Sequence, residues 1–292
     1  MSDAVIVTGS ATGLGLETAL HLAERGFQVY ATVRDLEQGR PAVLAAARER
    51  GVELRVLELD LTDAASIERA VAAVAGENGG VFGLVNNGGI GLRGCLEDVS
   101  ADEVRRVFEA NVFGTIAVTQ AVLPHMRAAR RGRIVTITSV GGRISAFGVG
   151  VYCASKFAQE GLGEALALEV APFGIQAALV EPGMIKTTRW SEHRGTAARA
   201  LDPASPYREL FRASEAMADR IVERSRTRPA DVAAAVHHAL TTGKPRMRYV
   251  VGRPARIVIV LRRYLPARFF ERVYFGSFLR RIRRQAAGVG TP

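Results

Sequence analysis

Short runs of β-branched and other apolar residues alternate with longer segments in which apolar positions recur at helical spacing. Short continuous apolar runs are typical of strands buried on both faces, and recurrence every three to four residues is typical of helices. The pattern predicts strands at Ala4–Thr8, Phe27–Val33, Leu54–Leu59, Phe82–Val85, Arg133–Thr138, Ile175–Val180 and Tyr249–Val251. It predicts helices at Gly13–Arg25, Arg40–Arg50, Asp63–Ala75, Ala101–Arg130 and Val151–Val170.

This alternation predicts an α/β fold, with a doubly wound, Rossmann-type parallel sheet of about seven strands covered by helices on both faces. We expect one domain over residues 1–252, interrupted by a polar, irregular loop or lid at 188–228, and a C-terminal helical extension at 253–292. In such sheets the ligand binds outside the carboxyl ends of the strands. The motifs that carry chemistry should therefore follow the strands.

Composition separates the body of the chain from its tail. The net charge is +10, but residues 246–292 alone hold 12 arginines and no lysine against one acidic residue, so the rest is nearly neutral. The N-terminus lacks the features of an export signal, and no apolar run reaches the length of a membrane span. The two cysteines, Cys95 and Cys153, offer neither a disulfide framework nor a metal-binding cluster. We expect a cytoplasmic protein without a metal site.

A glycine-rich turn follows the first predicted strand and opens the first helix. Its glycines permit a tight turn and close approach of the backbone to a pyrophosphate, whose charge the helix N-terminus favours. Taken alone, the turn could be only a tight strand-to-helix connection. Its position favours a dinucleotide site formed by Gly9, Ser10, Thr12, Gly13, Leu14 and Gly15.

The end of the second strand indicates which dinucleotide binds. Dinucleotide sites commonly place an acid about 20 residues after the glycine turn, where it binds the ribose 2′-hydroxyl, whereas an arginine there can pair with a 2′-phosphate. Val33 occupies the expected position of that acid and Arg34 follows it, which favours NADP(H) over NAD(H). Asp35, one residue further on, keeps NAD(H) open, and Arg34 could also be a solvated side chain.

Three residues after the fifth strand suit acid–base chemistry. Ser139 closes that strand, and Tyr152 and Lys156 lie four apart, on one face of the next helix. A free phenol has a pKa of about 10, which a nearby ammonium group lowers by stabilising the phenolate. Tyr152 could then exchange a proton with a substrate oxygen that Ser139 also binds. On spacing alone, Tyr152 and Lys156 could instead be a packed ring beside a solvated amine.

Together these motifs resemble the classical short-chain dehydrogenase/reductase family over about residues 3–252. The matching segments are Thr8–Gly15, Asp60, Asn86–Gly89, Asn111, Ser139, Tyr152–Lys156, Pro182–Gly183 and Thr187. Within the family, the motifs look most like the branch of 17β-hydroxysteroid dehydrogenase type 1 and the retinol dehydrogenases. One departure is Gly88, where the family usually has alanine.

The resemblance implies roles for residues that spacing does not assign. It implies that Asn111 supports a water-mediated proton relay to Lys156, which also holds the nicotinamide ribose. It implies that Asp60 and Leu61 contact the adenine, that Asn87, Gly88 and Gly89 line the cofactor, and that Ile185 and Thr187 bind the carboxamide. Pro182 and Gly183 are further expected cofactor contacts. A homodimer or homotetramer through the long helices is also implied. Asp60 could alternatively cap the following helix, although Thr62 or Asp63 could do so.

The basic tail reads as two helical segments divided by Pro266, with Phe270, Tyr274, Phe278 and Ile282 at four-residue spacing between arginines. A basic amphipathic helix of this kind can rest on an anionic membrane. The aromatics could instead pack on the domain over the substrate cleft while the arginines stay solvated. Docking of an acidic protein is a third interpretation. Nucleic-acid binding is not expected, because no recognition module is visible.

The sequence thus favours an NADP(H)-dependent enzyme that interconverts an alcohol and a carbonyl on a hydrophobic, lipid-like substrate. A 3-oxoacyl ketoreductase is the alternative within the same chemistry, although the tail extends some 40 residues past the last predicted strand. An alternative of another class is a cofactor-binding sensor or scaffold without turnover. The presence of Asn111, Ser139, Tyr152 and Lys156 together argues against a mere binder.

Overall fold

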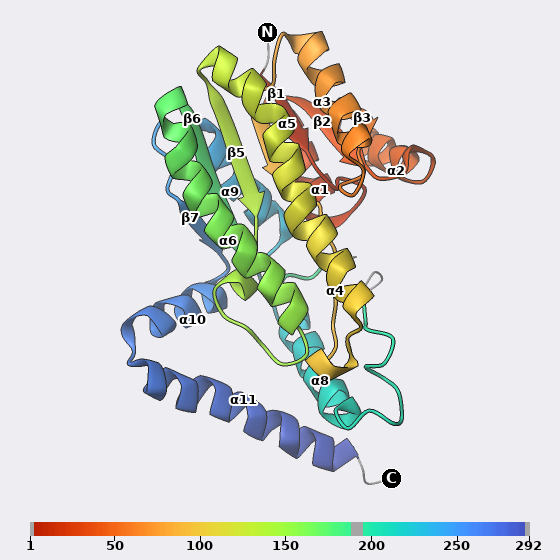
Figure 1. Cartoon of the computed structure of the whole chain (residues 1–292), viewed down its shortest axis with the longest axis vertical. Helices are drawn as coiled ribbons and strands as arrows, with labels where there is room; N and C mark the ends of the chain where they lie inside the picture. The colour runs from red at the N-terminus through yellow and green to blue at the C-terminus, as the bar shows by residue number, and fades with distance from the viewer. Residues whose placement is uncertain (1–2, 188–194, 290–292) are drawn as a thin grey trace.

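A computed structural model describes residues 3–187 and 195–289, which form a seven-stranded parallel sheet in the order β3-β2-β1-β4-β5-β6-β7 (Figure 1). All seven strands predicted from the sequence are confirmed, with ends that differ by one or two residues. The strands are β1 (Ala4–Val7), β2 (Gln28–Val33), β3 (Arg55–Glu58), β4 (Gly83–Asn86), β5 (Gly132–Ile137), β6 (Ile175–Pro182) and β7 (Arg248–Val251). The order reverses between β1 and β4, so the prediction of a doubly wound fold is confirmed.

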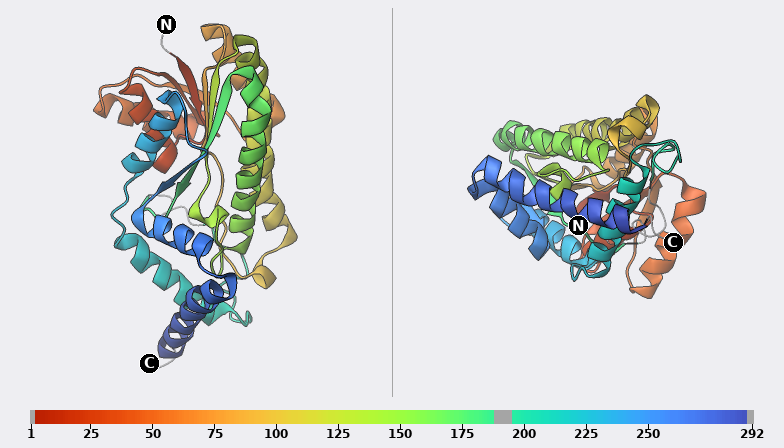
Figure 2. Two further views of the ribbon diagram at one scale, coloured as in Figure 1. Left: turned by 90° about the vertical axis from the view of Figure 1, so that its left-hand side faces the viewer. Right: turned by 90° about the horizontal axis from the view of Figure 1, so that it is seen from below.

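Helices cover both faces of the sheet, as Figure 2 shows. They are α1 (Gly13–Ala23), α2 (Leu36–Glu49), α3 (Ala64–Asn78), α4 (Ala101–Phe108), α5 (Gly114–Ala129), α6 (Gly150–Val170), α8 (Arg208–Glu223), α9 (Pro229–Thr241), α10 (Arg253–Tyr264) and α11 (Ala267–Val289), with short turns η1 (Leu96–Asp98), η2 (Glu109–Phe113), η3 (Val140–Gly142) and η4 (Ala171–Phe173). An apolar core lies on each face of the sheet, and the side chains of β1 contribute to both. Val5 and Val7 pack with α1 and α9, whereas Ala4 and Ile6 pack with α3 and α5. Successive side chains of a strand point to opposite faces, so an uninterrupted apolar strand serves both layers.

Two predicted helices differ from the structure in informative ways. The long helix expected at 101–130 is divided by a π-helical turn, η2, which contains Asn111. A π turn inserts an extra residue and commonly marks a functional position. Helix α2 begins at Leu36 rather than at Arg40, because the Asp35 carboxylate accepts a hydrogen bond from the Gln38 N–H and caps the helix there.

The expected irregular loop at 188–228 is only partly irregular. Residues 188–194, which include Trp190 and His193, lie outside the described part of the chain. Helix α8 occupies much of the remainder, and five residues separate it from α9, which begins at Pro229. Few apolar side chains of α8 are buried, Phe211 among them, and α11 packs against this helix. The sequence pattern missed α8 because its partner lies about 60 residues later in the chain.

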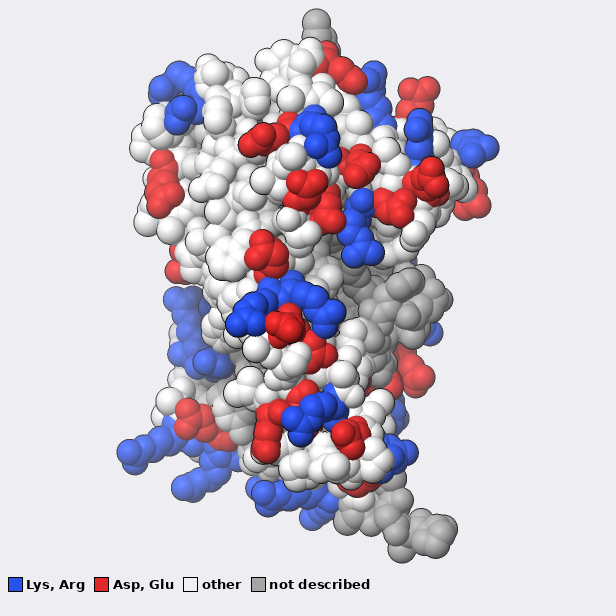
Figure 3. Space-filling model, turned by 45° about the vertical axis from the view of Figure 1, so that its right-hand side comes forward, with Lys and Arg blue, Asp and Glu red and all other residues white. Residues whose placement is uncertain are grey.

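The tail forms the two predicted helices, α10 and α11, on either side of Pro266 (Figure 1). Helix α11 packs against α8, and both lie beyond the carboxyl ends of the strands. Phe270 and Ile282 are buried, and the Phe270 and Tyr274 rings stack with their centres 5.1 Å apart. Of the positions singled out from the sequence, Phe270 and Ile282 therefore face the protein, and Tyr274 and Phe278 are half-buried. Many basic side chains lie around this lower end of the molecule (Figure 3).

The helical stretch Ala101–Ala129 is long and apolar enough, by length and composition, to cross a membrane. Half of its apolar window is buried inside the domain, against the sheet and neighbouring helices. This is the pattern of a core helix in a globular fold.

Docking of α11 should depend on Ile282, whose side chain is 1% exposed. We expect Ile282→Ala to weaken this docking by about 2–5 kcal/mol, the usual cost of truncating a buried isoleucine. The arginines of α11 should then be cleaved faster by trypsin, as gel electrophoresis of a time course would show. Leu279→Ala, at a position 40% exposed on the same helix, is the control. Equal cleavage rates for the two variants would contradict the prediction.

Candidate active site

The glycine turn is bound to the end of β4 by a compact set of hydrogen bonds. The Thr8 hydroxyl accepts from the backbone N–H groups of Asn87, at 3.0 Å, and Gly88, at 2.8 Å. The Asn87 amide donates to the carbonyl oxygens of Thr8, at 2.8 Å, and Gly9, at 3.0 Å. These bonds join residues that are 78 to 80 positions apart in sequence. They fix the glycine turn between β1 and β4, where the strand order of the sheet reverses.

The start of α1 has the features of a pyrophosphate-binding site. Its N-cap residue, Thr12, is exposed and makes no side-chain capping bond, which leaves N–H groups of the first turn for a ligand. Gly15 is buried, and a Cβ there would lie 2.3 Å from the Gly9 carbonyl oxygen. Leu14 is half-buried against the core. Ser10 is fully buried and its hydroxyl donates to the Val7 carbonyl, so this side chain shapes the turn from within.

The acids expected near the adenine have separate tasks in the structure. Asp35 caps α2, which directs its carboxylate toward a helix N-terminus, while Arg34 beside it is exposed. Asp63 caps α3, so Asp60 is not the cap of that helix. The Asp60 carboxylate instead accepts from the N–H and hydroxyl of Thr62, at 2.9 and 2.8 Å. This pairing holds the turn that carries Leu61.

Gly88, where the family usually has alanine, has a local explanation. A Cβ at this position would lie 2.7 Å from Cδ1 of Leu61 and 3.2 Å from the Thr8 hydroxyl. The Leu61 side chain therefore occupies the space that an alanine methyl group would need. Gly88 and Leu61 fit as a pair, and the glycine leaves no gap in this wall of the site.

Ser139 and Tyr152 face the same small space. Ser139 caps η3, and its hydroxyl accepts from the Gly141 N–H at 3.0 Å. A Cβ at Gly141 would lie 3.3 Å from the Ser139 hydroxyl oxygen and 3.6 Å from Cε1 of Tyr152. Tyr152 lies in the first turn of α6 and is half-buried. Both side chains therefore lie beside Gly141, just after the end of β5.

The Lys156 side chain is 6% exposed and is held by acceptors of the protein. Its ammonium donates to the Ile137 carbonyl at 3.1 Å and to the Gln159 side-chain oxygen at 2.8 Å. It lies 5.9 Å from the centre of the Tyr152 ring. A buried cation is costly unless it is hydrogen-bonded, so these contacts position the charge beside the phenol.

Gln159 is the site residue that the sequence analysis missed. Its amide nitrogen donates to the Asn111 carbonyl at 2.6 Å and to the Thr115 hydroxyl at 2.9 Å, while its oxygen accepts from Lys156. It therefore forms a direct bridge between Asn111 and Lys156. Its place three residues after Lys156, on the same helix face, was the available signal, but a glutamine there could equally be solvated.

The Asn111 side chain serves a structural purpose. It is fully buried, accepts from the Ile90 N–H at 2.7 Å, and donates to the Ile90 carbonyl at 2.9 Å and to the Ser155 hydroxyl at 3.0 Å. These bonds join the segment after β4 to α6. Gly89 lies so close that a Cβ there would be 2.7 Å from the Asn111 side-chain oxygen. The connection to Lys156 runs through the Asn111 backbone carbonyl. This carbonyl accepts from the Gln159 amide nitrogen, and the Gln159 side-chain oxygen accepts from Lys156.

Behind Ser139, a buried ionic cluster joins β5, β6, α6 and β7. Glu181 contacts Arg143 and Arg248, each at 3.0 Å, and Arg248 also contacts Glu160 at 2.9 Å. The Thr138 hydroxyl donates to Glu160 at 2.6 Å. Burial, together with the nearby Glu160 charge, raises the pKa of Glu181 to about 7. The cluster fixes the end of β5, and with it Ser139, relative to the helix that carries Lys156.

The end of β6 and the segment after it return toward the glycine turn. Pro182 is buried, and the Gly183 N–H donates to the Val251 carbonyl at 2.9 Å. Ile185 packs into the core that contains α1 and α9. Thr187 approaches the glycine turn, since a Cβ at Gly13 would lie 4.0 Å from its Cβ. These four residues thus lie at the carboxyl end of β6, at the edge of the sheet where Ser139 follows β5.

The cysteines lie apart from this chemistry. Burial raises the pKa of the Cys95 thiol to about 11, helped by the Asp98 charge, and burial also raises the pKa of Cys153. Neither thiol would be a ready nucleophile at neutral pH. In the described part of the chain, no group of three or more His, Cys, Asp or Glu side chains is arranged to hold a metal ion.

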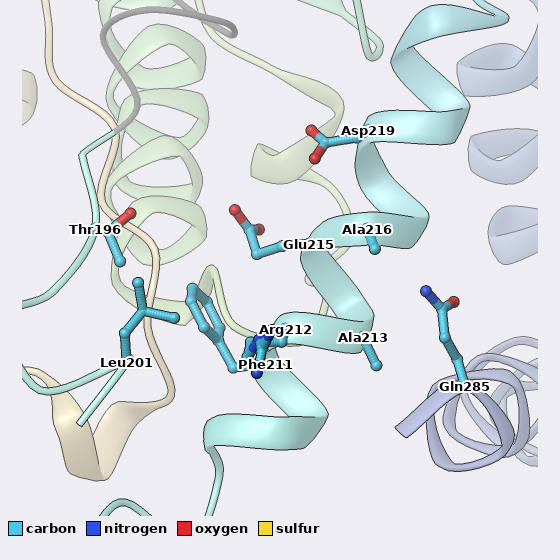
Figure 4. A pocket seen from close by; sticks show the side chains of 9 residues that line it. All are labelled: Thr196, Leu201, Phe211, Arg212, Ala213, Glu215, Ala216, Asp219 and Gln285. Atoms are coloured by element: carbon cyan, nitrogen blue, oxygen red, sulfur yellow. The ribbon is translucent and has the colours of Figure 1, made fainter. Parts of the chain in front are cut away.

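A cavity of about 460 Å³ lies between α8, the segment around Leu201 and α11 (Figure 4). Phe211 and Glu215 of α8 point toward Thr196 and Leu201, and Gln285 of α11 contributes to the lining. Asn111, Ser139, Tyr152 and Lys156 do not line this cavity. Phe211 also belongs to an apolar cluster that includes Val151, the neighbour of Tyr152, so the region adjoins the catalytic helix.

Residues 3–197 match the model of the short chain dehydrogenase family. A 3-ketodihydrosphingosine reductase of Bacteroides thetaiotaomicron is 42% identical over 63% of this chain and 64% of its own, so the chain spans less than two thirds of that relative. The human 17-beta-hydroxysteroid dehydrogenase type 1 is 38% identical over 84% of this chain and 76% of its own. Mouse retinol dehydrogenase 5 is 37% identical over 93% and 88%. The expected branch of the family is therefore confirmed.

Solved structures agree in fold. An actinorhodin polyketide ketoreductase with NADPH has a TM-score of 0.71 and 31% identity, covering 85% of this chain and 95% of its own. A short chain dehydrogenase/reductase of Burkholderia phymatum in complex with NAD has a TM-score of 0.78 and 26% identity, covering 90% and 93%. Both nicotinamide cofactors thus occur among similar structures.

Gly15→Ala should weaken cofactor binding about ten-fold or more, because the new methyl group would clash with the Gly9 carbonyl and with the Asn87 amide. Isothermal titration with NADPH would measure the change. Gly76→Ala is the matched control. It lies in α3 with nothing within 4 Å of the new Cβ, and it should stabilise the fold by about 0.5–1 kcal/mol. Unchanged affinity in Gly15→Ala would show that the turn does not bind the cofactor.

Proposed function

The chain belongs to the short-chain dehydrogenase family, and we propose that it is an NADP(H)-dependent oxidoreductase that interconverts an alcohol and a carbonyl on a hydrophobic, lipid-like substrate. One observation carries the proposal. Ser139, Tyr152 and the buried ammonium of Lys156 converge at the edge of the sheet where the glycine turn also lies. A protein that only bound a nucleotide would not need this combination of hydroxyl, phenol and cation.

In this proposal the bound nicotinamide supplies or accepts the hydride at the substrate carbon. Ser139 hydrogen-bonds the substrate oxygen and Tyr152 transfers the proton, giving it to the oxygen during reduction and removing it during oxidation. Lys156, 5.9 Å from the Tyr152 ring centre, stabilises the phenolate form by its charge. The family resemblance implies that Lys156 also holds the nicotinamide ribose, and the proposal includes this role.

The preference for NADP(H) rests on the end of β2. Arg34 is exposed there, free to approach a 2′-phosphate, and Asp35 is engaged as the cap of α2. The carboxylate that would favour NAD(H) is thus directed elsewhere. The similar ketoreductase structure with NADPH supports this choice, while the similar structure with NAD makes a direct comparison of the two cofactors necessary.

The substrate proposal rests on the apolar surroundings and on relatives. Leu92, Val151 and Phe211 belong to one cluster beside the start of the catalytic helix. The relatives are named for a ketosphingoid, a steroid and retinol, which share an apolar body with one alcohol or carbonyl group. We propose a substrate of that chemical class for this chain, with a 3-oxoacyl group as the competing one.

Oligomer formation through α5 and α6 is part of the proposal. Phe113, Phe157 and Leu168, on η2 and α6, expose apolar side chains on that side of the molecule, with Leu168 78% exposed. A homodimer would remove these side chains from water. The cytoplasmic location expected from the sequence stays a prediction.

The test of the function is consumption of NADPH and of NADH by the purified protein with steroid, retinoid, ketosphingoid, 3-oxoacyl and simple aromatic carbonyls. We expect NADPH turnover with the apolar substrates and a loss of about 10³-fold or more in Tyr152→Phe, because the proton donor is removed. Tyr152→Phe should still bind NADPH. Full turnover in this variant would refute the mechanism, and NADPH binding without turnover on any substrate would favour the sensor alternative.

Gln159 should act as a positioning residue for Lys156. We expect Gln159→Leu to lower kcat about ten-fold with little change in KM, since Lys156 loses an acceptor and the Asn111 carbonyl loses a donor. In the oxidation direction, the midpoint of the pH–rate profile should move to higher pH, because the phenolate is less well stabilised. Gln38→Leu, at an exposed position on α2 away from the proposed oligomer interface, is the control. An unchanged pH profile in Gln159→Leu would leave Gln159 only a packing role.

A further inference from the structure

Helix α10 exposes an apolar stripe to solvent. Its large side chains at spacings of three and four residues lie on one face of the helix. Their exposed fractions are 51% for Ile257, 52% for Val260, 43% for Leu261 and 73% for Tyr264. Apolar side chains exposed singly are common, but four in one stripe indicate an interaction surface.

The opposite face of α10 already attaches the helix to the domain. Ala255 is buried against Gly183, and Val258 and Ile259 are half-buried. The helix is therefore apolar on two faces, one used by the fold and one not. The start of α11 also exposes apolar side chains, since Phe269 is 54% exposed and Val273 49% exposed. Packing of the tail on its own domain accounts for Phe270 and Ile282 but not for these side chains.

Cationic side chains accompany the stripe. Six arginines of α10 and the beginning of α11 are exposed, and within residues 3–187 and 195–289 none of them forms an ion pair with a carboxylate: Arg253, Arg256, Arg262, Arg263, Arg268 and Arg272. Figure 3 shows basic side chains gathered at this end of the molecule. The surface thus combines an apolar stripe with unpaired positive charge.

We propose that α10 and the first turns of α11 dock the protein on an anionic lipid bilayer, with Ile257, Val260, Leu261 and Tyr264 inserted at the interface. A bilayer fits both observations at once, because its headgroups attract the arginines while its acyl region accepts apolar side chains without matching their shape. The tyrosine at the end of the stripe suits the headgroup level. An acidic protein would satisfy the charges, but it would need an apolar groove to cover the stripe. The inference concerns binding and holds whether or not the proposed reaction is correct.

The test is flotation of the full-length protein with vesicles of phosphatidylcholine alone and of phosphatidylcholine with phosphatidylglycerol, at low and high salt. We expect binding to the anionic vesicles, weakened by salt, and a loss of about ten-fold or more in the double variant Ile257→Ser/Leu261→Ser. Leu96→Ser is the control, since Leu96 is 75% exposed but lies beside Glu97 on η1. Circular dichroism would verify that both variants fold.

Two outcomes would overturn the proposal. Equal binding of the wild type and the double variant would exclude the α10 stripe as the contact. Failure of the wild type to bind anionic vesicles would exclude the bilayer as the occupant. In the second case, sedimentation of the protein alone would show whether a second copy covers the stripe, because self-association would then be lost in the double variant.

Discussion

The burial of the Lys156 ammonium is the constraint on which the site depends. A cation that is 6% exposed must have acceptors at fixed positions, and here the Ile137 carbonyl and the Gln159 amide provide them. The Ile137 carbonyl belongs to β5, so the lysine is fixed to the strand that leads to Ser139. Gln159 extends the contact to the π turn through the Asn111 carbonyl. The buried charge of Lys156, with its acceptors, therefore links α6, β5 and η2 around Tyr152.

The ionic cluster of Glu160, Glu181, Arg143 and Arg248 supports the same arrangement from behind. Its members come from α6, β6, the loop after η3 and β7, and Glu160 lies one turn beyond Lys156 on α6. Removing one member of a buried ionic group leaves its partners uncompensated, so the cluster resists small displacements of these elements. Precise placement of Ser139 against the phenol thus depends on electrostatics outside the site.

One part of the tail packs into the folded domain, and another part exposes an apolar surface to solvent. Helix α11 gives α8 an apolar partner and contributes a wall of the cavity beside it. Helix α10 attaches to β7 by one face and leaves the other in solvent. The arginines of this region lie around two surfaces, the packed face of α11 and the exposed stripe of α10. The sequence pattern of the tail was therefore compatible both with packing on the domain and with binding to a partner or a membrane.

Local rules were sufficient for the strands, the glycine turn and the Ser139, Tyr152 and Lys156 group. Parallel strands buried on both faces read as short apolar runs, and residues at their carboxyl ends meet at one edge whatever the details of packing. The sequence therefore determined the fold class and the family, and the family match agrees. The roles of Ser139, Tyr152 and Lys156 stay a prediction. Tertiary structure decided what depends on partners distant in the chain. Gln159 became a bridge because η2 lies beside α6, α8 formed against α11, and the apolar face of the tail that stays exposed is that of Ile257 and Leu261, not that of Phe270 and Ile282. Periodicity shows that a helix has an apolar face, but only packing decides which face is covered.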